Sequence, residues 1–291
     1  MNSRLNQVGR WVESACLIEV LSPKPGNVSP GREFADASVR DFLNSARASA
    51  PELGLSDARP LGQTILKAVE ATRAVVNHNT NLGIILLIAP LAAVPAGISL
   101  KDGIADVLNA TTVDDSRLVY QAIRFAQPGG LGDVVEQDLH DEPTVNLQEC
   151  MRLAADRDMI ARQYANGFDD ILTKGVLWLD EAAGRPVAQP LQIAWLAIRL
   201  LAEFGDSLIA RKRGQEMSDL VRRRACEVLD SGWPIAHDSA GRFAEFDAFL
   251  RADGNRRNPG TTADMVAAIL FSALREGLWA PDENVSWSLI V

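Results

Sequence analysis

One apolar stretch constrains the fold of this chain more than any other feature. Residues 82–100 read LGIILLIAPLAAVPAGISL, a length that would permit a membrane-spanning helix. However, Pro90 and Pro95 interrupt the stretch, it is rich in alanine, and no cluster of positive charges flanks it. We therefore predict a buried central helix of a soluble protein rather than a membrane span, with the other elements packed around it.

The other apolar residues recur mostly at helical spacing, as Leu61, Ile65, Leu66 and Val69 do. No segment has the sustained alternation of a strand or the spacing of a βαβ unit. No internal repeat or change of composition marks a domain boundary. We therefore predict a single all-α domain over residues 1–291, a multi-helix bundle around the apolar helix. The other expected helices are 5–21, 36–50, 61–76, 101–110, 114–127, 145–166, 168–183, 190–210, 217–229, 242–250 and 262–278.

Composition and charge restrict the class of partner. The chain has 291 residues, 47% hydrophobic and 23% charged, and a formal net charge of -9. A nucleic acid is not expected as a partner, because proteins that bind its backbone usually present a basic face. A small anionic nucleotide stays possible, since a local basic cluster or a divalent cation can reverse the field in a cleft.

The cysteines and the N-terminus indicate a compartment. Cys16, Cys150 and Cys226 are scattered, and no CxxC or Cys/His cluster occurs. We expect reduced thiols and no zinc site. The first residues contain no apolar signal core, so we expect a cytoplasmic protein. The oligomeric state is not indicated.

A stiff bend follows the first expected helix, with the sequence SPKPGNV over residues 22–28. Pro23 and Pro25 fix the backbone on both sides of Lys24, and Gly26 can adopt a positive φ. The bend should therefore hold the Lys24 ammonium in one direction. An ordinary surface loop is the alternative interpretation.

A polar segment, NHNTN over residues 77–81, directly precedes the apolar helix. Asn and Thr are favourable N-cap residues, and one side chain is enough for a cap. The surplus side chains would lie at the positive end of the helix dipole, where an anion is favoured. The alternative is a capped turn with solvated polar residues.

Three further polar segments carry charge. The loop 128–144 contains Asp133, Glu136 and Asp138, which would be solvated or hold a cation. In the expected helix 145–166, Asp158 and Arg162 are spaced i and i+4 and could pair. The segment 256–264 combines two arginines, an Asn-Pro-Gly turn, two threonines and an aspartate.

The common nucleotide motifs are absent. The sequence contains no GxxxxGK[ST], no GxGxxG between a strand and a helix, and no GxSxG. A nucleotide would therefore have to be bound in a less common way.

Taken together, the polar segments resemble the triphosphoribosyl-dephospho-CoA synthase family over most of the chain. The matching positions are Lys24, Pro25, Gly26, Asn27, Asp36, Ser45, Asn79, Thr80, Gly83, Asn258, Pro259, Gly260, Ala263 and Asp264. The resemblance implies an all-α enzyme that transfers the triphosphoribosyl group of ATP to the 2′-hydroxyl of dephospho-CoA and releases adenine, for prosthetic-group or cofactor biosynthesis.

Several positions depart from the family pattern. Asn81 stands where the family has His, Leu82 where it has Lys, and Thr261 and Thr262 where it has Gly and Ser. A cation and an imidazole are therefore missing from a presumed site. The chain resembles a divergent branch, whose acceptor could differ from dephospho-CoA.

The implied reaction needs carboxylates near the sugar, acid and base groups, and cations on the triphosphate. We predict Asp36, Asp264 and Glu136 as catalytic residues, and Mg²⁺ ligands among Asp36, Asp133 and Asp138. The residues predicted to bind ATP or the CoA-like acceptor are Lys24, Pro25, Gly26, Asn27, Asn79, Thr80, Asn81, Gly83, Arg157, Arg162, Asn258 and Gly260, and Arg211 and Arg213 are further candidates for phosphate contacts.

Two alternatives remain open. The same scaffold could act on another acceptor, for example in one-carbon cofactor biosynthesis, which the residues at 81 and 82 favour. The chain could also be a non-catalytic helical protein that binds a nucleotide or a partner. Polar segments spread between good core helices argue against the second alternative.

Overall fold

The computed structural model describes residues 5–128, 137, 139, 141–283, 285 and 287, and this part of the chain is helical without a strand. The all-α prediction is therefore confirmed. The elements are α1 (Gln7–Leu21), α2 (Val39–Leu53), the short 3₁₀ helix η1 (Ser56–Ala58), α3 (Leu61–Arg73), α4 (Leu82–Ala93), α5 (Leu100–Asn109), α6 (Val113–Ala126), α7 (Leu147–Ala154), α8 (Met159–Asn166), the π-helix η2 (Asp170–Gly175), α9 (Val176–Ala183), α10 (Gln189–Phe204), α11 (Ser207–Arg213), α12 (Gln215–Asp230), α13 (Ser239–Arg251) and α14 (Gly260–Glu276).

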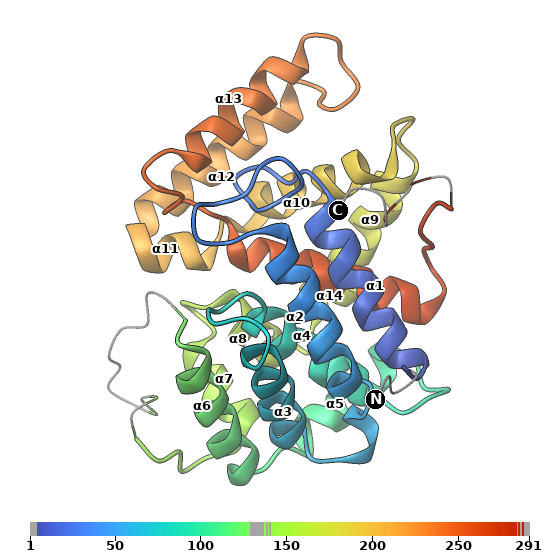
Figure 1. Cartoon of the computed structure of the whole chain (residues 1–291), viewed down its shortest axis with the longest axis vertical. Helices are drawn as coiled ribbons and strands as arrows, with labels where there is room; N and C mark the ends of the chain where they lie inside the picture. Colours follow the sequence, from blue (N-terminus) through green and yellow to red (C-terminus); the bar gives the residue numbers. More distant parts are fainter. Residues whose placement is uncertain are drawn as a thin grey trace.

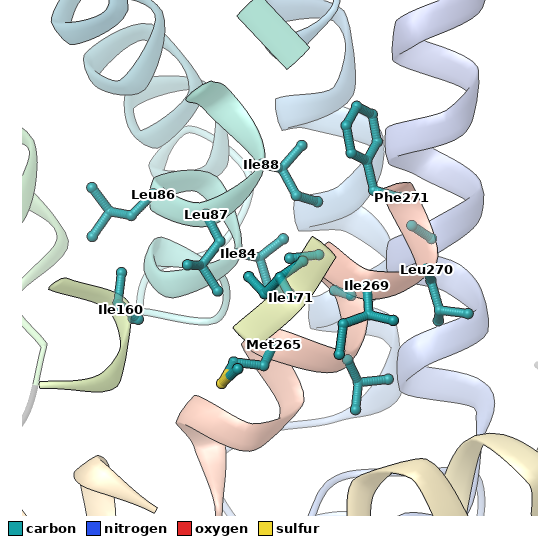
Figure 2. Close-up of a cluster of buried hydrophobic side chains, with 14 of the residues drawn as sticks. Ile84, Leu86, Leu87, Ile88, Ile160, Ile171, Met265, Ile269, Leu270 and Phe271 are labelled. Carbon is teal, nitrogen blue, oxygen red and sulfur yellow. The ribbon is translucent and has the colours of Figure 1, made fainter. Parts of the chain in front are cut away.

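The predicted central helix is α4, and α14 packs along it. All α4 residues except Gly83 and Ala93 are buried. In Figure 2, Leu87 and Ile88 of α4 lie in one cluster with Met265 and Phe271 of α14. Burying a Leu or Ile side chain contributes about 1.5–3 kcal/mol, so this contact is a major part of the core.

The apolar helix is shorter than the apolar stretch. It ends at Ala93 because Val94 is extended, as a residue before proline usually is. Among the described helices, none combines the length and the apolar character that crossing a bilayer requires.

Pro90 lies inside α4 and has no N–H to donate to the carbonyl of Leu86. The hydroxyl of Tyr164 on α8 donates to this carbonyl instead, at 2.6 Å. Tyr164 is fully buried. A helix-breaking residue thus attaches α8 to the central helix.

The other helices surround this pair (Figure 1). Helix α1 packs against α2 and α14, and α3 packs against α2, α4 and α6. Helices α11, α12 and α13 lie at one end of the molecule, and α3, α5, α6 and α7 lie towards the other end. The residues 22–38, which contain the bend, lie between α1 and the α11–α13 end.

Two expected helices are divided, which corrects the prediction. The range 145–166 consists of α7 and α8, because Asp158 caps α8 by accepting hydrogen bonds from the N–H groups of Ile160 and Ala161 at 2.9 and 3.1 Å. The predicted pairing of Asp158 with Arg162 is therefore wrong. Arg162 instead lies 3.1 Å from Asp170. The range 190–210 is divided into α10 and α11 at Gly205, whose φ is +69°.

Candidate active site

The bend at 22–28 is held in place by α13. Gly26 has a φ of +70°, and its N–H donates to Asp247 at 2.7 Å. A Cβ at Gly26 would lie 2.5 Å from the Cβ of Leu250, so only glycine fits. Arg251 binds the Asp247 carboxylate at 2.9 Å and donates to the carbonyl of Asn27 at 2.6 Å. The last helices therefore fix a segment near the N-terminus.

The bend directs Lys24 inwards. The ammonium lies 2.9 Å from a carboxylate oxygen of Glu19 on α1, and both side chains are buried. It also donates to the carbonyls of Glu19 and Ser22. Burial raises the pKa of Glu19, and the Lys24 charge opposes this effect. The predicted contact of Lys24 with phosphate stays a prediction, because the ammonium is already surrounded by these partners.

The most unusual carboxyl group belongs to Asp264, in the second turn of α14. It lies directly against Gly83 of α4, where a Cβ would be 2.0 Å from Oδ2 of Asp264 and 2.8 Å from Cδ1 of Ile160. Among the described residues, Asp264 has no hydrogen bond or ion pair. Glycine at position 83 therefore leaves the space in which this carboxyl lies.

The surroundings of Asp264 favour its protonated form. Burial raises its pKa well above the usual range, and the charges of Glu19, Asp206 and Asp158 raise it further, while Arg211 lowers it. A carboxyl group that keeps its proton towards neutral pH can act as a general acid.

Three helices begin close to this carboxyl. Gly83 is in the first turn of α4, Ile160 is in the first turn of α8, and Asp264 is near the start of α14. The N-termini of α8 and α14 are linked through Ser207, whose hydroxyl lies 3.3 Å from the N–H of Met159 and 3.1 Å from the hydroxyl of Thr261. Helix N-termini carry partial positive charge, so this region can accept an anion.

Two acidic residues in this region were not predicted as site residues. Asp158 caps α8 and forms an ion pair with Arg211 of α11. Asp206 is buried and accepts a hydrogen bond from the N–H of Thr262 at 2.8 Å. A glycine that ends one helix, followed by an aspartate that caps the next, is a recognisable sequence pattern. The pair Gly205-Asp206 has this pattern, which could have indicated Asp206 from the sequence.

The polar segment 77–81 contacts α2. Asn79 caps α4 by accepting from the N–H of Leu82 at 3.1 Å. The hydroxyl of Thr80 lies 2.6 Å from that of Ser45, and the amide of Asn81 donates to Ser49 at 3.3 Å. The predicted surplus of polar groups is thus largely used to join α4 to α2. Asn81 also lines a small hollow with Cys16, Glu19 and Phe42.

The C-terminal segment meets the bend. The amide of Asn27 lies 3.4 Å from the carbonyl of Pro259, and Pro259 also lies close to Gly26. Asn258 has a buried Oδ1 without a hydrogen-bond partner, and Gly260 contacts Leu208. The structure therefore brings together the segments around positions 24, 83 and 264, which the sequence alone left open.

Several other predicted site residues make contacts that do not include Asp264. Asp36 is exposed, and its charge acts to raise the pKa of Lys212 on α11. Arg157 is exposed and donates to the carbonyl of its neighbour Leu153 at 3.2 Å. Arg162 is paired with Asp170, as described above. Arg213 lies 3.0 Å from Asp253 on the opposite side of its helix from the Arg211 pair.

The predicted metal ligands are tested only in part. Asp133, Glu136 and Asp138 lie outside the described residues. Over the described ranges, no group of three or more His, Cys, Asp or Glu side chains is arranged to hold a metal ion. A metal site made by these side chains alone is therefore not found there.

Comparisons with known proteins show which family the chain belongs to. No curated protein matches the sequence. A crystal structure of a proposed triphosphoribosyl-dephospho-CoA synthase from Archaeoglobus fulgidus matches at 26% sequence identity and a TM-score of 0.65, covering 81% of this chain and 99% of that one. The family model for ATP:dephospho-CoA triphosphoribosyl transferase (CitG) matches residues 5–282, nearly the whole sequence. The chain therefore belongs to the CitG family of ATP:dephospho-CoA triphosphoribosyl transferases.

Proposed function

We propose that this transferase moves the triphosphoribosyl group of ATP to the 2′-hydroxyl of dephospho-CoA, or of a closely related acceptor, with release of adenine. One observation carries the proposal for the site. Asp264 is a partly buried carboxyl group without a partner among the described residues, and it lies where three helices begin. Such a group can transfer a proton beside an anionic substrate.

Asp264 acts on the leaving group. The bond between C1′ of the ribose and N9 of adenine breaks, which leaves positive charge on the sugar and requires a proton on the purine. Asp264 donates this proton. The acceptor hydroxyl forms the new bond to C1′ and releases its own proton, which returns to Asp264. The net reaction moves one proton from the hydroxyl to adenine and regenerates the acid.

The triphosphate is bound by the N-termini of α4, α8 and α14 together with Lys212. The Lys212 ammonium makes no hydrogen bond or ion pair with the described residues. Partial burial and then Arg211 lower its pKa, while Asp206 and Asp36 oppose this effect. A phosphate group would relieve the repulsion between the two cations. Lys212 is thus available for phosphate in a way that the buried Lys24 is not.

Mg²⁺ would be supplied with the substrate, as the complex of the triphosphate, and would neutralise part of its charge. This ion usually keeps several waters and needs only one or two protein carboxylates when it also binds phosphates. Asp36 is the member of the predicted ligand set within the described part of the chain, and it lies near Lys212. Its carboxylate can contact such a complex.

The test measures free adenine by chromatography after incubation with ATP, Mg²⁺ and dephospho-CoA. The wild-type protein should release adenine, and Asp264→Asn should lower the rate about 100-fold or more, because an amide cannot supply the proton. Asp180→Asn, a change on the exposed surface, is the matched control. Adenine release by Asp264→Asn at the wild-type rate would contradict the role of Asp264. A wild-type protein that binds ATP without releasing adenine with any CoA-like acceptor would instead be the non-catalytic alternative.

A different acceptor is the second candidate. The side chain of Asn81 is bonded to Ser49, and Leu82 is buried, so neither offers the cation or imidazole that the family has at these positions. A panel of CoA-like and pterin acceptors, compared by the kcat/KM for adenine release, separates the two. A panel member that exceeds dephospho-CoA by more than tenfold would identify another acceptor class.

A further inference from the structure

One buried carboxylate joins the first turns of α11 and α14. Asp206 accepts hydrogen bonds at Oδ1 from the N–H groups of Leu208 and Ile209, at 2.9 and 3.1 Å. At Oδ2 it accepts from both the N–H and the hydroxyl of Thr262, each at 2.8 Å. The side chain caps its own helix with one oxygen and holds a distant helix with the other.

Asp206 is itself held in place. The hydroxyl of Ser218 on α12 lies 3.0 Å from the N–H of Asp206 and 3.1 Å from its carbonyl oxygen. Gly205 has a φ of +69°, and a Cβ there would lie 2.6 Å from the Ser218 hydroxyl. Both the backbone and the carboxylate of Asp206 are therefore fixed.

This arrangement reaches the proposed acid through a short path. Thr262 lies two residues before Asp264, in the first turn of the same helix. The hydrogen bonds to Asp206 fix this turn of α14. They therefore also fix the position of the Asp264 carboxyl relative to Gly83. The same Asp206 also lies close enough for its charge to act on Asp264.

We propose that Asp206 is a positioning residue for adenine release: its hydrogen bonds to the first turns of α11 and α14 set the place of the Asp264 carboxyl beside Gly83. The inference rests on the proposed function. It adds a residue that the sequence motifs did not indicate. The contact between α11 and α14 is the feature that positions Asp264.

Other charges around Asp264 limit the size of the effect. Glu19 faces it from α1, Asp158 from the start of α8, and Arg211 from α11. Burial is the main cause of the raised pKa of Asp264, and Glu19 acts more strongly than Asp206. Burial also raises the pKa of Asp206 itself, while its hydrogen bonds from Thr262, Ile209 and Leu208 oppose this effect and favour the charged form. Loss of the Asp206 charge should therefore lower the pKa of Asp264 only in part. Because the protonated acid is the active form, activity is lost as the pH rises through this pKa.

The decisive variant is Asp206→Asn, which keeps the shape and removes the charge. We expect the alkaline limb of kcat/KM for adenine release to move by about one pH unit to lower pH, and kcat at neutral pH to fall about tenfold. The KM for ATP should change less than about threefold, because the N-termini of α4 and α8 and the Lys212 ammonium keep their phosphate contacts.

Asp115→Asn is the matched control. Asp115 is also buried and also joins two helices, since it accepts from the N–H of Gly62 on α3 and from the N–H and hydroxyl of Thr112, each at 2.8 Å. Both variants should lower the thermal midpoint. Only Asp206→Asn should move the alkaline limb, so a limb that is unmoved, or that moves equally in Asp115→Asn, overturns the inference.

Two further measurements cover the remaining outcomes. If Asp206→Asn does not fold, Thr262→Val removes one hydrogen bond to Asp206 and keeps its charge, and it should lower kcat with an unchanged KM for ATP. A wild-type kcat in this variant overturns the inference. An infrared carboxylic-acid band that is present in the wild-type protein and absent in Asp264→Asn belongs to protonated Asp264. Its intensity as a function of pH reports the protonation of Asp264 without turnover. A wild-type protein without adenine release refutes the proposed function, whereas an infrared titration of Asp264 that is unchanged by Asp206→Asn refutes the coupling alone.

Discussion

At the scale of single residues, the site depends on what is missing as much as on what is present. Gly83 has no side chain, and the Asp264 carboxyl lies in the space that a methyl group would fill. Lys24 has a charge, but Glu19 and two carbonyls already satisfy it. The sequence singled out both positions as binding residues, and those roles stay predictions. It could not show that the Lys24 side chain points inwards to Glu19, because the bend that carries Lys24 is held by Asp247, more than 200 residues further along the chain.

Gly83→Ala should separate activity from folding. Alanine is favourable in a helix, but its Cβ would overlap Asp264 and force that carboxyl to move. We expect adenine release to fall about 10- to 100-fold, with little change in circular dichroism. Gly241→Ala is the control, because Gly241 is also helical and a Cβ there meets open space. Equal activity in both variants would show that the position of Asp264 does not matter.

Replacement of Lys24 should primarily affect stability. Lys24→Met leaves Glu19 buried without its partner, which costs about 3–5 kcal/mol. The pKa of Glu19 is already raised by burial, and it rises further in the variant, so the folded state binds a proton more tightly than the unfolded state. Stability should therefore fall as the pH rises from the ordinary glutamate pKa through the raised value. Urea unfolding at pH 5 and pH 8 measures this difference, and Glu19→Gln added to Lys24→Met should remove most of it. A variant as stable as wild type at pH 8 would show that Lys24 has another role.

At the scale of elements, local pattern predicted most helices and failed where a helix boundary depends on distant partners. The spacing of apolar residues identified α3, and the continuous apolar run identified α4, because both patterns are local properties of the sequence. The breaks at Asp158 and Asp206 were missed although each side chain caps the helix that directly follows it. Local sequence could not show that each carboxylate also binds a residue far along the chain, Arg211 and Thr262 respectively. Asp206 was absent from the predicted site for the same reason.

The Pro90 interruption of α4 offers a test of how helices are joined. Tyr164→Phe removes the hydroxyl that satisfies the carbonyl of Leu86, and should lower the free energy of unfolding by about 1–3 kcal/mol. Pro90→Ala restores an N–H four residues after Leu86, so the same Tyr164→Phe change should cost clearly less in that background. Denaturant unfolding of the four proteins gives the coupling energy. Equal costs in both backgrounds would mean that the hydroxyl does not substitute for the missing N–H.

At the scale of the whole molecule, segments from the two ends of the sequence close around the central helix. The bend after α1 is fixed by Asp247 and Arg251 of α13, and it contacts the turn before α14 at Pro259. The motif order pointed to a family but left open whether these segments meet in space, because their contacts join residues more than 200 positions apart in the sequence. The predicted contribution of the acidic residues in 133–138 stays a prediction, because they lie outside the described part of the chain.

The unpaired carboxyl of Asp264 also makes the protein a proton acceptor during substrate binding. A triphosphate that arrives beside Asp264 adds negative charge and raises the pKa of that group further, so part of the population should take up a proton from the buffer. Calorimetric binding enthalpies for ATP should then change with the ionisation enthalpy of the buffer, and this dependence should weaken in Asp264→Asn. Substrate affinity would consequently be greater in mildly acidic than in alkaline solution. The charge that repels ATP is removed by the same proton that adenine needs in order to leave.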